Sequence, residues 1–154
     1  MRYLAKRVER ICDELYRLRI VQRMEWTERG PVRATLEIER KVSRSVICQK
    51  IHFYAACPRI DFETTVDWKE HQHLLKVHFP MDVHTDEATF EIQFGNVTRK
   101  THQNTSWVQA RFESCGQKWI DVSEGHYGIS LLNDCKYGHS VHNGEMALTL
   151  IKSG

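Results

Sequence analysis

Hydrophobic residues change their spacing about two dozen residues into the chain. Before that point they recur at intervals of four and three, at Leu4, Val8, Ile11, Leu15 and Leu18. Charged residues lie between them, so the spacing predicts an amphipathic helix with nearly a heptad seam. We place this helix in residues 1–29, because Gly30 and Pro31 then break the pattern. Such a helix would either cover the sheet that follows or mediate self-association as a short coiled coil.

From Val32 onward the hydrophobic residues alternate with polar ones at a period of two, which is typical of β-strands. In "VRATLEIER" the apolar side holds Val32, Ala34, Leu36 and Ile38. In "SVICQKIHFYA" one side holds Ile47, Gln49, Ile51 and Phe53. Five later segments and "RIDFETTVDW" continue the alternation, which gives about eight strands parted by short turns such as "SEGH" and "HNGE". Since no second long helical pattern separates them, we expect a mainly β fold, an antiparallel β-sandwich over residues 30–154.

Composition and charge narrow the class of protein. With 154 residues, 41% hydrophobic and 27% charged, the chain has the size and composition of one globular domain. Its formal net charge of +2 lacks the concentrated basic excess that nucleic acids or anionic membranes attract. No apolar leader and no run of about 18 apolar residues is present, so we expect no membrane partner. Five cysteines without CxxC spacing predict reduced thiols and a cytoplasmic location.

The connection between the last strands carries the densest group of polar side chains. It contains Asn133, Asp134, Cys135, Lys136 and Tyr137. Asp, Asn and Lys can bind sugar hydroxyls, and a tyrosine ring can stack on a sugar face, so a ligand-contacting loop is one interpretation. Ordinary turn chemistry around Gly138 and Gly144 is the other. A catalytic thiol is not expected, because no segment provides a recognisable base for Cys135.

One histidine pair has a spacing that could suit a metal site. If "EHQHLL" is a strand, His71 and His73 project from the same face and could both bind a metal ion. No third ligand has a convincing spacing, so we predict no metal ligand in this chain. The 20 acidic residues likewise single out no catalytic carboxylate pair.

Four segments, in order, carry a family resemblance. They are "PRIDFETTVDWKEHQHLLKVHFPMDV", "FEIQFGNVTRKTHQNTSW", "ARFESCGQKWIDVSE" and "YGISLLNDCKYGHSVHNGEMALTLIKS". Together they resemble the C-terminal half of glycoside hydrolase family 38 α-mannosidases, in the branch of bacterial and yeast-vacuolar type enzymes. The resemblance runs from about Gly30 to Ser153, so the first 29 residues are expected to depart from the family.

The resemblance implies both a fold and an activity. The fold is a large β-sandwich of the galactose-mutarotase-like (supersandwich) type. Family members hydrolyse α-mannosides with retention, using an aspartate nucleophile, an acid/base carboxylate and a divalent metal, usually zinc. Those groups belong to an N-terminal α/β barrel, which this chain does not contain, so we expect no catalytic residue and no cofactor here.

The resemblance also suggests which residues approach the sugar or the barrel. The segment like "LLNDCKYG" and the strand after it belong to the sandwich side that faces the barrel. This assigns a substrate-binding or barrel-facing role to Asn133, Asp134, Lys136, Tyr137 and Lys152. Lys152 stands where the family commonly has Arg, and a lysine lacks the planar fork that holds two groups at once.

Two functions from different classes follow. The first is a non-catalytic sandwich that supports the sugar site of an α-mannosidase; its partners would be the missing N-terminal catalytic domain and an α-mannoside or mannose-containing oligosaccharide. The second is a free-standing carbohydrate-binding or self-associating module, with the N-terminal helix forming a homo-oligomer. An aldose-epimerase-like enzyme has less support, because no His–Glu pair stands out and fold analogy alone is a weak argument.

Overall fold

The chain divides into two compact units, Met1–His71 and Gln72–Gly154. The computed structural model describes residues 21–154, which form strands β1 to β12 and one short helix, α2. Every strand pair is antiparallel, so the predicted mainly β, antiparallel fold is confirmed. No helix within residues 21–154 is long and apolar enough to span a membrane.

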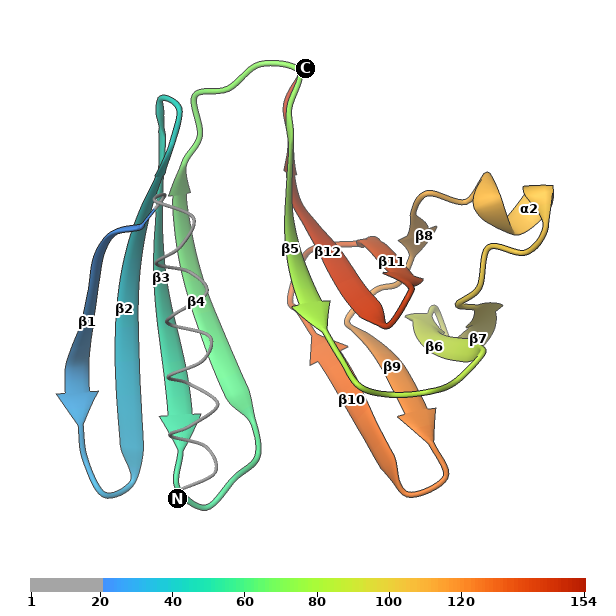
Figure 1. Ribbon diagram of the computed structural model, residues 1–154, viewed down its shortest axis with the longest axis horizontal. Coiled ribbons are helices and arrows are strands. Elements are labelled where there is room, and N and C mark those ends of the chain that lie inside the picture. The colour runs from blue at the N-terminus through green and yellow to red at the C-terminus, as the bar shows by residue number, and fades with distance from the viewer. Residues whose placement is uncertain (1–20) are drawn as a thin grey trace. The chain divides into compact units, whose positions relative to one another are not determined.

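The first unit contains one four-stranded sheet, whose strands lie side by side in chain order (Figure 1). The strands are β1 (Val21–Arg29), β2 (Arg33–Val42), β3 (Ser45–Tyr54) and β4 (Ile60–Asp67). Gly30 and Pro31 lie in the turn between β1 and β2, where the Gly30 amide donates to Arg33 O at 2.9 Å. The two breakers therefore end a strand and not a helix.

The period-two pattern correctly predicts the two faces of this sheet. Leu36 pairs with Ile51, and both are buried, at 2% and 6% exposure. Ile38 is fully buried and pairs with Gln49. Residues directly opposite in an antiparallel pair share a face, so these side chains make one apolar face and the polar positions between them make the other.

The predicted extent of the N-terminal helix is wrong at its C-terminal end. Residues 21–29 form strand β1, in which Met24 pairs with Ile38 and Trp26 with Leu36. The last residue with helical spacing is Leu18, so the sequence offered no helical period beyond it, and tertiary pairing with β2 decides the conformation. The rest of the predicted helix and its self-association seam lie outside the described residues.

The second unit is a sandwich of two four-stranded sheets (Figure 1). One sheet has the order β10-β9-β6-β7 and the other β5-β12-β11-β8. The elements, in chain order, are β5 (Leu74–Pro80), β6 (Glu87–Ile92), β7 (Gly95–Lys100), α2 (Ser106–Gln109), β8 (Ser114–Cys115), β9 (Trp119–Glu124), β10 (Tyr127–Leu132), β11 (Gly138–His142) and β12 (Glu145–Lys152).

Side chains from both sheets form the core of this sandwich. Phe90 and Ile120 come from the first sheet, and Val141 and Met146 from the second. All four are at most 4% exposed. Burial of such apolar side chains is the main stabilising contribution to the unit.

The "HNGE" segment forms the predicted tight turn between β11 and β12. Asn143 and Gly144 connect the strands and have φ angles of 53° and 73°. Asn–Gly with two positive φ angles is the preferred two-residue hairpin turn, because its twist matches that of the strands. The turn fixes the register in which His139 pairs with Leu148.

Gly128 marks a close approach of β10 and β9. A Cβ atom at this position would lie 2.1 Å from Ser123 Oγ and 2.8 Å from Ser123 Cβ. We expect Gly128→Ala to lower the free energy of unfolding by about 1–3 kcal/mol, the usual cost of forced overpacking. Urea denaturation measures this. Gly125→Ala is the matched control, since a Cβ there meets nothing within 4 Å; an equal loss in both variants would contradict the explanation.

Candidate functional site

The polar connection singled out in the sequence is an ordered loop between β10 and β11, which we call the Asn133–Tyr137 loop. The Asn133 backbone amide donates to Lys118 O at 2.8 Å. Its side-chain Nδ2 donates to Gln117 O at 3.1 Å, and its Oδ1 accepts from the Lys136 amide at 2.6 Å. Asn133 therefore acts within the domain, holding the loop to the segment before β9, and presents little to a ligand.

The buried side chain of His139 contacts both ends of this loop. His139, on β11, is fully buried; its Nδ1 lies 3.2 Å from Tyr137 O and its Nε2 3.4 Å from Asn133 Nδ2. A carbonyl accepts and an amide NH₂ donates, so the ring is neutral with its proton on Nδ1. Burial lowers the pKa of His139 from its ordinary value, against the Tyr137 carbonyl and Glu113, which favour the charged form.

The core also fixes the His139 ring. Phe90 meets it edge to face, with the ring centroids 6.4 Å apart. A Cβ at Gly116 would lie 3.2 Å from His139 Nδ1, and the Gly116 amide donates to Tyr137 O at 3.1 Å. Tyr137 O thus accepts two hydrogen bonds, and the loop is tied down at both ends.

Three loop side chains remain available to solvent. Asp134 and Cys135 are exposed, and Tyr137 is 56% exposed. The carboxylate of Asp134 beside Cys135 holds the pKa of that thiol above its ordinary value. A raised pKa disfavours the thiolate, which is the nucleophilic form of cysteine. Tyr137 and Asp134 are the groups that a sugar or a protein could contact.

Lys152 belongs to a different cluster, on the sheet that contains β5 and β12. Glu113 Oε1 lies 2.5 Å from Lys76 Nζ and accepts from the hydroxyl of Thr149. Burial alone would raise the pKa of Glu113, but the hydrogen bonds from Lys76 and Thr149 and the charge of Lys152 outweigh it and the pKa is lowered. Among the described residues, no hydrogen bond or ion pair joins Lys152 to the Asn133–Tyr137 loop. Glu113 itself lies beside the end of the loop, since a Cβ atom at Gly138 would lie 3.2 Å from Glu113 Oε2.

The histidine pair does not lie on a strand. His71 and His73 are in the segment between β4 and β5, since β5 begins only at Leu74. The sequence premise for a shared face is therefore wrong. Within residues 21–154, no group of three or more His, Cys, Asp or Glu side chains is placed to hold a metal ion. The described residues offer no ligand set for the zinc that the family resemblance implies.

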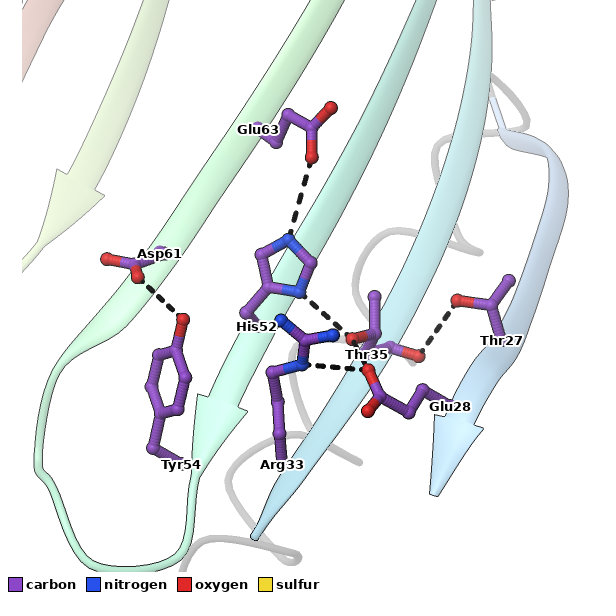
Figure 2. A network of polar contacts seen from close by, with 8 residues as sticks. All are labelled: Thr27, Glu28, Arg33, Thr35, His52, Tyr54, Asp61 and Glu63. Atoms are coloured by element: carbon purple, nitrogen blue, oxygen red, sulfur yellow. Dashed lines mark hydrogen bonds and ion pairs between the residues drawn. The ribbon is translucent and has the colours of Figure 1, made fainter. Parts of the chain in front are cut away.

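A second polar cluster, which the sequence analysis did not single out, covers the polar face of the first unit (Figure 2). Thr35 Oγ1 and Arg33 Nε both donate to Glu28 Oε2, at 2.9 and 2.8 Å. His52 Nδ1 lies 2.9 Å from the same Thr35 hydroxyl, and its Nε2 lies 3.7 Å from Glu63 Oε2. Because Thr35 gives its proton to Glu28, its oxygen accepts from His52 Nδ1.

The other end of this cluster joins β3 to β4. Tyr54 Oη donates to Asp61 Oδ2 at 2.8 Å, and Arg59 Nε lies 2.5 Å from Asp61 Oδ1 (Figure 2 shows Tyr54 and Asp61). Arg59 and then Tyr54 lower the pKa of Asp61, and Arg33 and then Thr35 lower that of Glu28. Thr35 is only 4% exposed, so its hydroxyl is shielded from solvent and is satisfied by Glu28 and His52. In the sequence, this cluster was indicated only by the polar side of the alternation in "VRATLEIER", which includes Arg33 and Thr35.

One solved structure and one family model show to which class of protein the chain belongs. The fold matches the crystal structure of an α-mannosidase from Enterococcus faecalis V583 with a TM-score of 0.76, over 85% of this chain and 18% of that one, at 19% identity. The chain belongs to glycosyl hydrolase family 38, because the model of its C-terminal domain, "Glycosyl hydrolases family 38 C-terminal domain", matches residues 7–154. The family resemblance seen in the sequence is confirmed.

Curated relatives agree with this assignment. The chain is 43% identical over 136 residues to α-mannosidase G of Dictyostelium discoideum, 82% of this chain and 12% of that protein. It is 46% identical over 109 residues to human α-mannosidase 2C1 and 47% identical over 100 residues to an α-mannosidase of Saccharomyces cerevisiae, 71% and 64% of this chain. The chain spans about a tenth of the length of these relatives (10% and 9% of the last two).

The family match begins earlier than the sequence analysis placed it. We expected residues 1–29 to depart from the family, but the match starts at residue 7. Strand β1 explains part of the difference, since Val21–Arg29 pairs along β2 as a member of the same sheet.

Proposed function

We propose that this chain is the non-catalytic C-terminal β-domain of an α-mannosidase that hydrolyses α-mannosides with retention of configuration. In that enzyme it supports the sugar site of a catalytic barrel that is absent from this chain. The observation that carries the proposal is the match of residues 7–154 to the C-terminal domain of the family, in relatives of which the matched part makes up only 10–12%.

The Asn133–Tyr137 loop is the part of the domain best suited to this role. Its backbone is fixed by Asn133 and by the buried His139, while Asp134 and the ring of Tyr137 face solvent. A rigid loop that carries exposed polar and aromatic groups can position them against a sugar or a neighbouring domain at low entropic cost. Lys152 would act separately, through the cluster around Glu113.

The chemistry of bond cleavage is assigned to the absent part of the enzyme. Zinc and both catalytic carboxylates would be held there, since the described residues provide no metal-ligand group. Within residues 21–154 the four cysteines, Cys48, Cys57, Cys115 and Cys135, are free thiols. Free exposed thiols support a reducing compartment, and we propose the cytoplasm.

The proposal predicts that activity requires both parts. The isolated chain, with added zinc, should hydrolyse 4-nitrophenyl α-mannoside no faster than buffer. A chimera of α-mannosidase G, in which the matched 136-residue segment is replaced by that of this chain, should retain turnover. Deleting the segment without replacement is the control and should abolish turnover.

Two results would contradict the proposal. Turnover by the isolated chain would place catalytic groups within it. Full turnover by the deletion variant would mean that the segment does not support the site. Saturable binding of mannobiose by the isolated chain, with no effect of the deletion, would favour the free-standing carbohydrate-binding module instead.

A further inference from the structure

A phenylalanine stands in a strained position at the turn between β6 and β7. Gln93 and Phe94 connect the two strands, and Phe94 has a φ angle of 61°. The left-handed region costs a residue with a bulky side chain about 1 kcal/mol or more, whereas glycine and asparagine adopt it readily. Phe94 is also fully exposed, at 110% of the reference area. The pairing of β6 with β7, up to Ile92 opposite Gly95, holds the backbone of the turn, but it gives the Phe94 ring no burial.

This turn lies at the same end of its sheet as the Asn133–Tyr137 loop. The Lys118 amide donates to Glu91 Oε2 at 2.7 Å, near the end of β6, and Lys118 O accepts from the Asn133 amide at 2.8 Å. Lys118 therefore links the two segments. The exposed residues at this end include Gln93, Asp134 and Cys135. We call four others, Phe94, Lys118, Leu132 and Tyr137, the Phe94 rim.

The size of the rim suits a protein contact. Leu132 is 70% exposed and Tyr137 56%. With strands about 4.8 Å apart, a rim from β10 across β9 to the β6–β7 turn is roughly 10–15 Å wide. Exposed aromatic side chains on an ordered support are typical of interface anchors.

A sugar is a poorer occupant for this surface. Sugar and other small-ligand sites are concave, but Phe94 projects from a hairpin turn. The second unit has a hollow of about 660 Å³ lined by Asp86 and Thr101, at the opposite ends of β6 and β7. The Phe94 rim and this hollow therefore lie at opposite ends of strands β6 and β7.

We infer that the Phe94 rim is where this domain docks on the rest of its α-mannosidase polypeptide, with the Phe94 ring entering an apolar pocket there. The inference rests on the proposed function. The amount of protein outside the chain supports this occupant, since the chain covers 12% of α-mannosidase G. Lys118, exposed at the same end of the sheet, predicts an acidic group facing it across the docked surface. Burial of Phe94 in the pocket offsets the backbone strain.

The test uses Phe94→Asn and Phe94→Gly, in the isolated chain and in the α-mannosidase G chimera. Both replacements suit a positive φ angle, so the isolated chain should melt at the same temperature or higher. In the chimera they should shorten the half-life of heat inactivation by about tenfold, as expected for loss of an interface anchor. Tyr127→Asn is the matched control, because it removes an exposed aromatic residue from the other end of β10; it should leave the half-life unchanged.

The remaining outcomes distinguish a failure of the docking inference from a failure of the proposed function. An active chimera whose half-life is unaffected by both Phe94 variants would overturn the docking inference alone. A wild-type chimera without turnover would overturn the proposed function and this inference with it. If the isolated chain forms a dimer that Phe94→Asn dissociates, the rim binds a second copy of the chain. If Phe94→Asn abolishes mannobiose binding, the rim binds sugar. Either result would overturn the docking inference.

Discussion

Alanine at position 139 should destabilise the second unit by about 2–4 kcal/mol, the range for removing a large buried side chain. His139 is fully buried and packs edge to face on Phe90. Its removal leaves a cavity, and Asn133 Nδ2 and Tyr137 O each lose one partner. Both groups keep another, Gln117 O and the Gly116 amide, so the cavity is the larger part of the cost.

Two measurements separate the effects of this change. Urea denaturation gives the free energy of unfolding, and hydrogen exchange of the Lys136 amide reports on the Asn133–Tyr137 loop. His142→Ala on the same strand is the matched control, since His142 is only half-buried and its Nδ1 donates to Thr101 O at 3.3 Å. The control should cost less than about 1 kcal/mol. If both variants lose the same free energy of unfolding, then the buried His139 side chain contributes no more to stability than the half-buried His142 side chain.

Strands β2 and β3 of the first unit could be predicted because their side chains obey one simple rule. Leu36 and Ile38 are buried and Glu37 lies on the polar face, as the alternation requires. The helix boundary could not be predicted, because β1 has a mixed pattern. Val21, Met24 and Trp26 are only partly buried, and the register of β1 slips twice against β2. A strand of this kind is decided by its neighbour and not by its own period.

The position of the Asn133–Tyr137 loop in the chain could be predicted from its polar composition, but its conformation could not. Its polar composition was visible, yet Asn133 bonds to Gln117, 16 residues away, and no spacing rule indicates that contact. No role was assigned to His139 from the sequence. The alternation of His139 with Val141, both buried, was the signal that could have placed it in the core. Lys152 was grouped with the loop by resemblance alone, and its electrostatic partner is Glu113.

Phe94 was missed for a different reason. Sequence patterns identify core positions by hydrophobicity, so an apolar residue in "FEIQFGNV" is read as part of a strand. The structure places it at the turn with a positive φ angle. Backbone strain combined with exposure is visible only in three dimensions, and it often marks a functional position.

Acidification should destabilise the second unit, and His139 should be responsible for part of the effect. Burial holds the pKa of His139 below its ordinary value of about 6.5, so the folded state favours the neutral ring. A histidine with a depressed pKa gives its full stabilisation above the unfolded-state pKa. As the pH falls below about 6.5, the unfolded chain binds a proton that the folded chain resists, and the stabilisation is lost progressively down to the folded-state pKa.

Protonation also disrupts the geometry around the ring. Nε2 would gain a proton facing Asn133 Nδ2, which is itself a donor, while Nδ1 would still donate to Tyr137 O. Glu113 is the charged group that favours the protonated ring, and its influence is smaller than that of burial. The expected result is a weaker hold on the Asn133–Tyr137 loop at low pH.

The measurement is the free energy of unfolding between pH 7.5 and pH 5, for the wild type and for His139→Gln. Other histidines titrate in the same range, including His78 beside Glu145 and His84 beside Asp82. Only the difference between the two proteins isolates position 139. Wild type should lose its advantage over His139→Gln as the pH falls, because glutamine cannot bind the proton. A difference that stays constant over the whole range would mean that the pKa of His139 is the same in the folded and the unfolded chain, so that burial does not favour its neutral form.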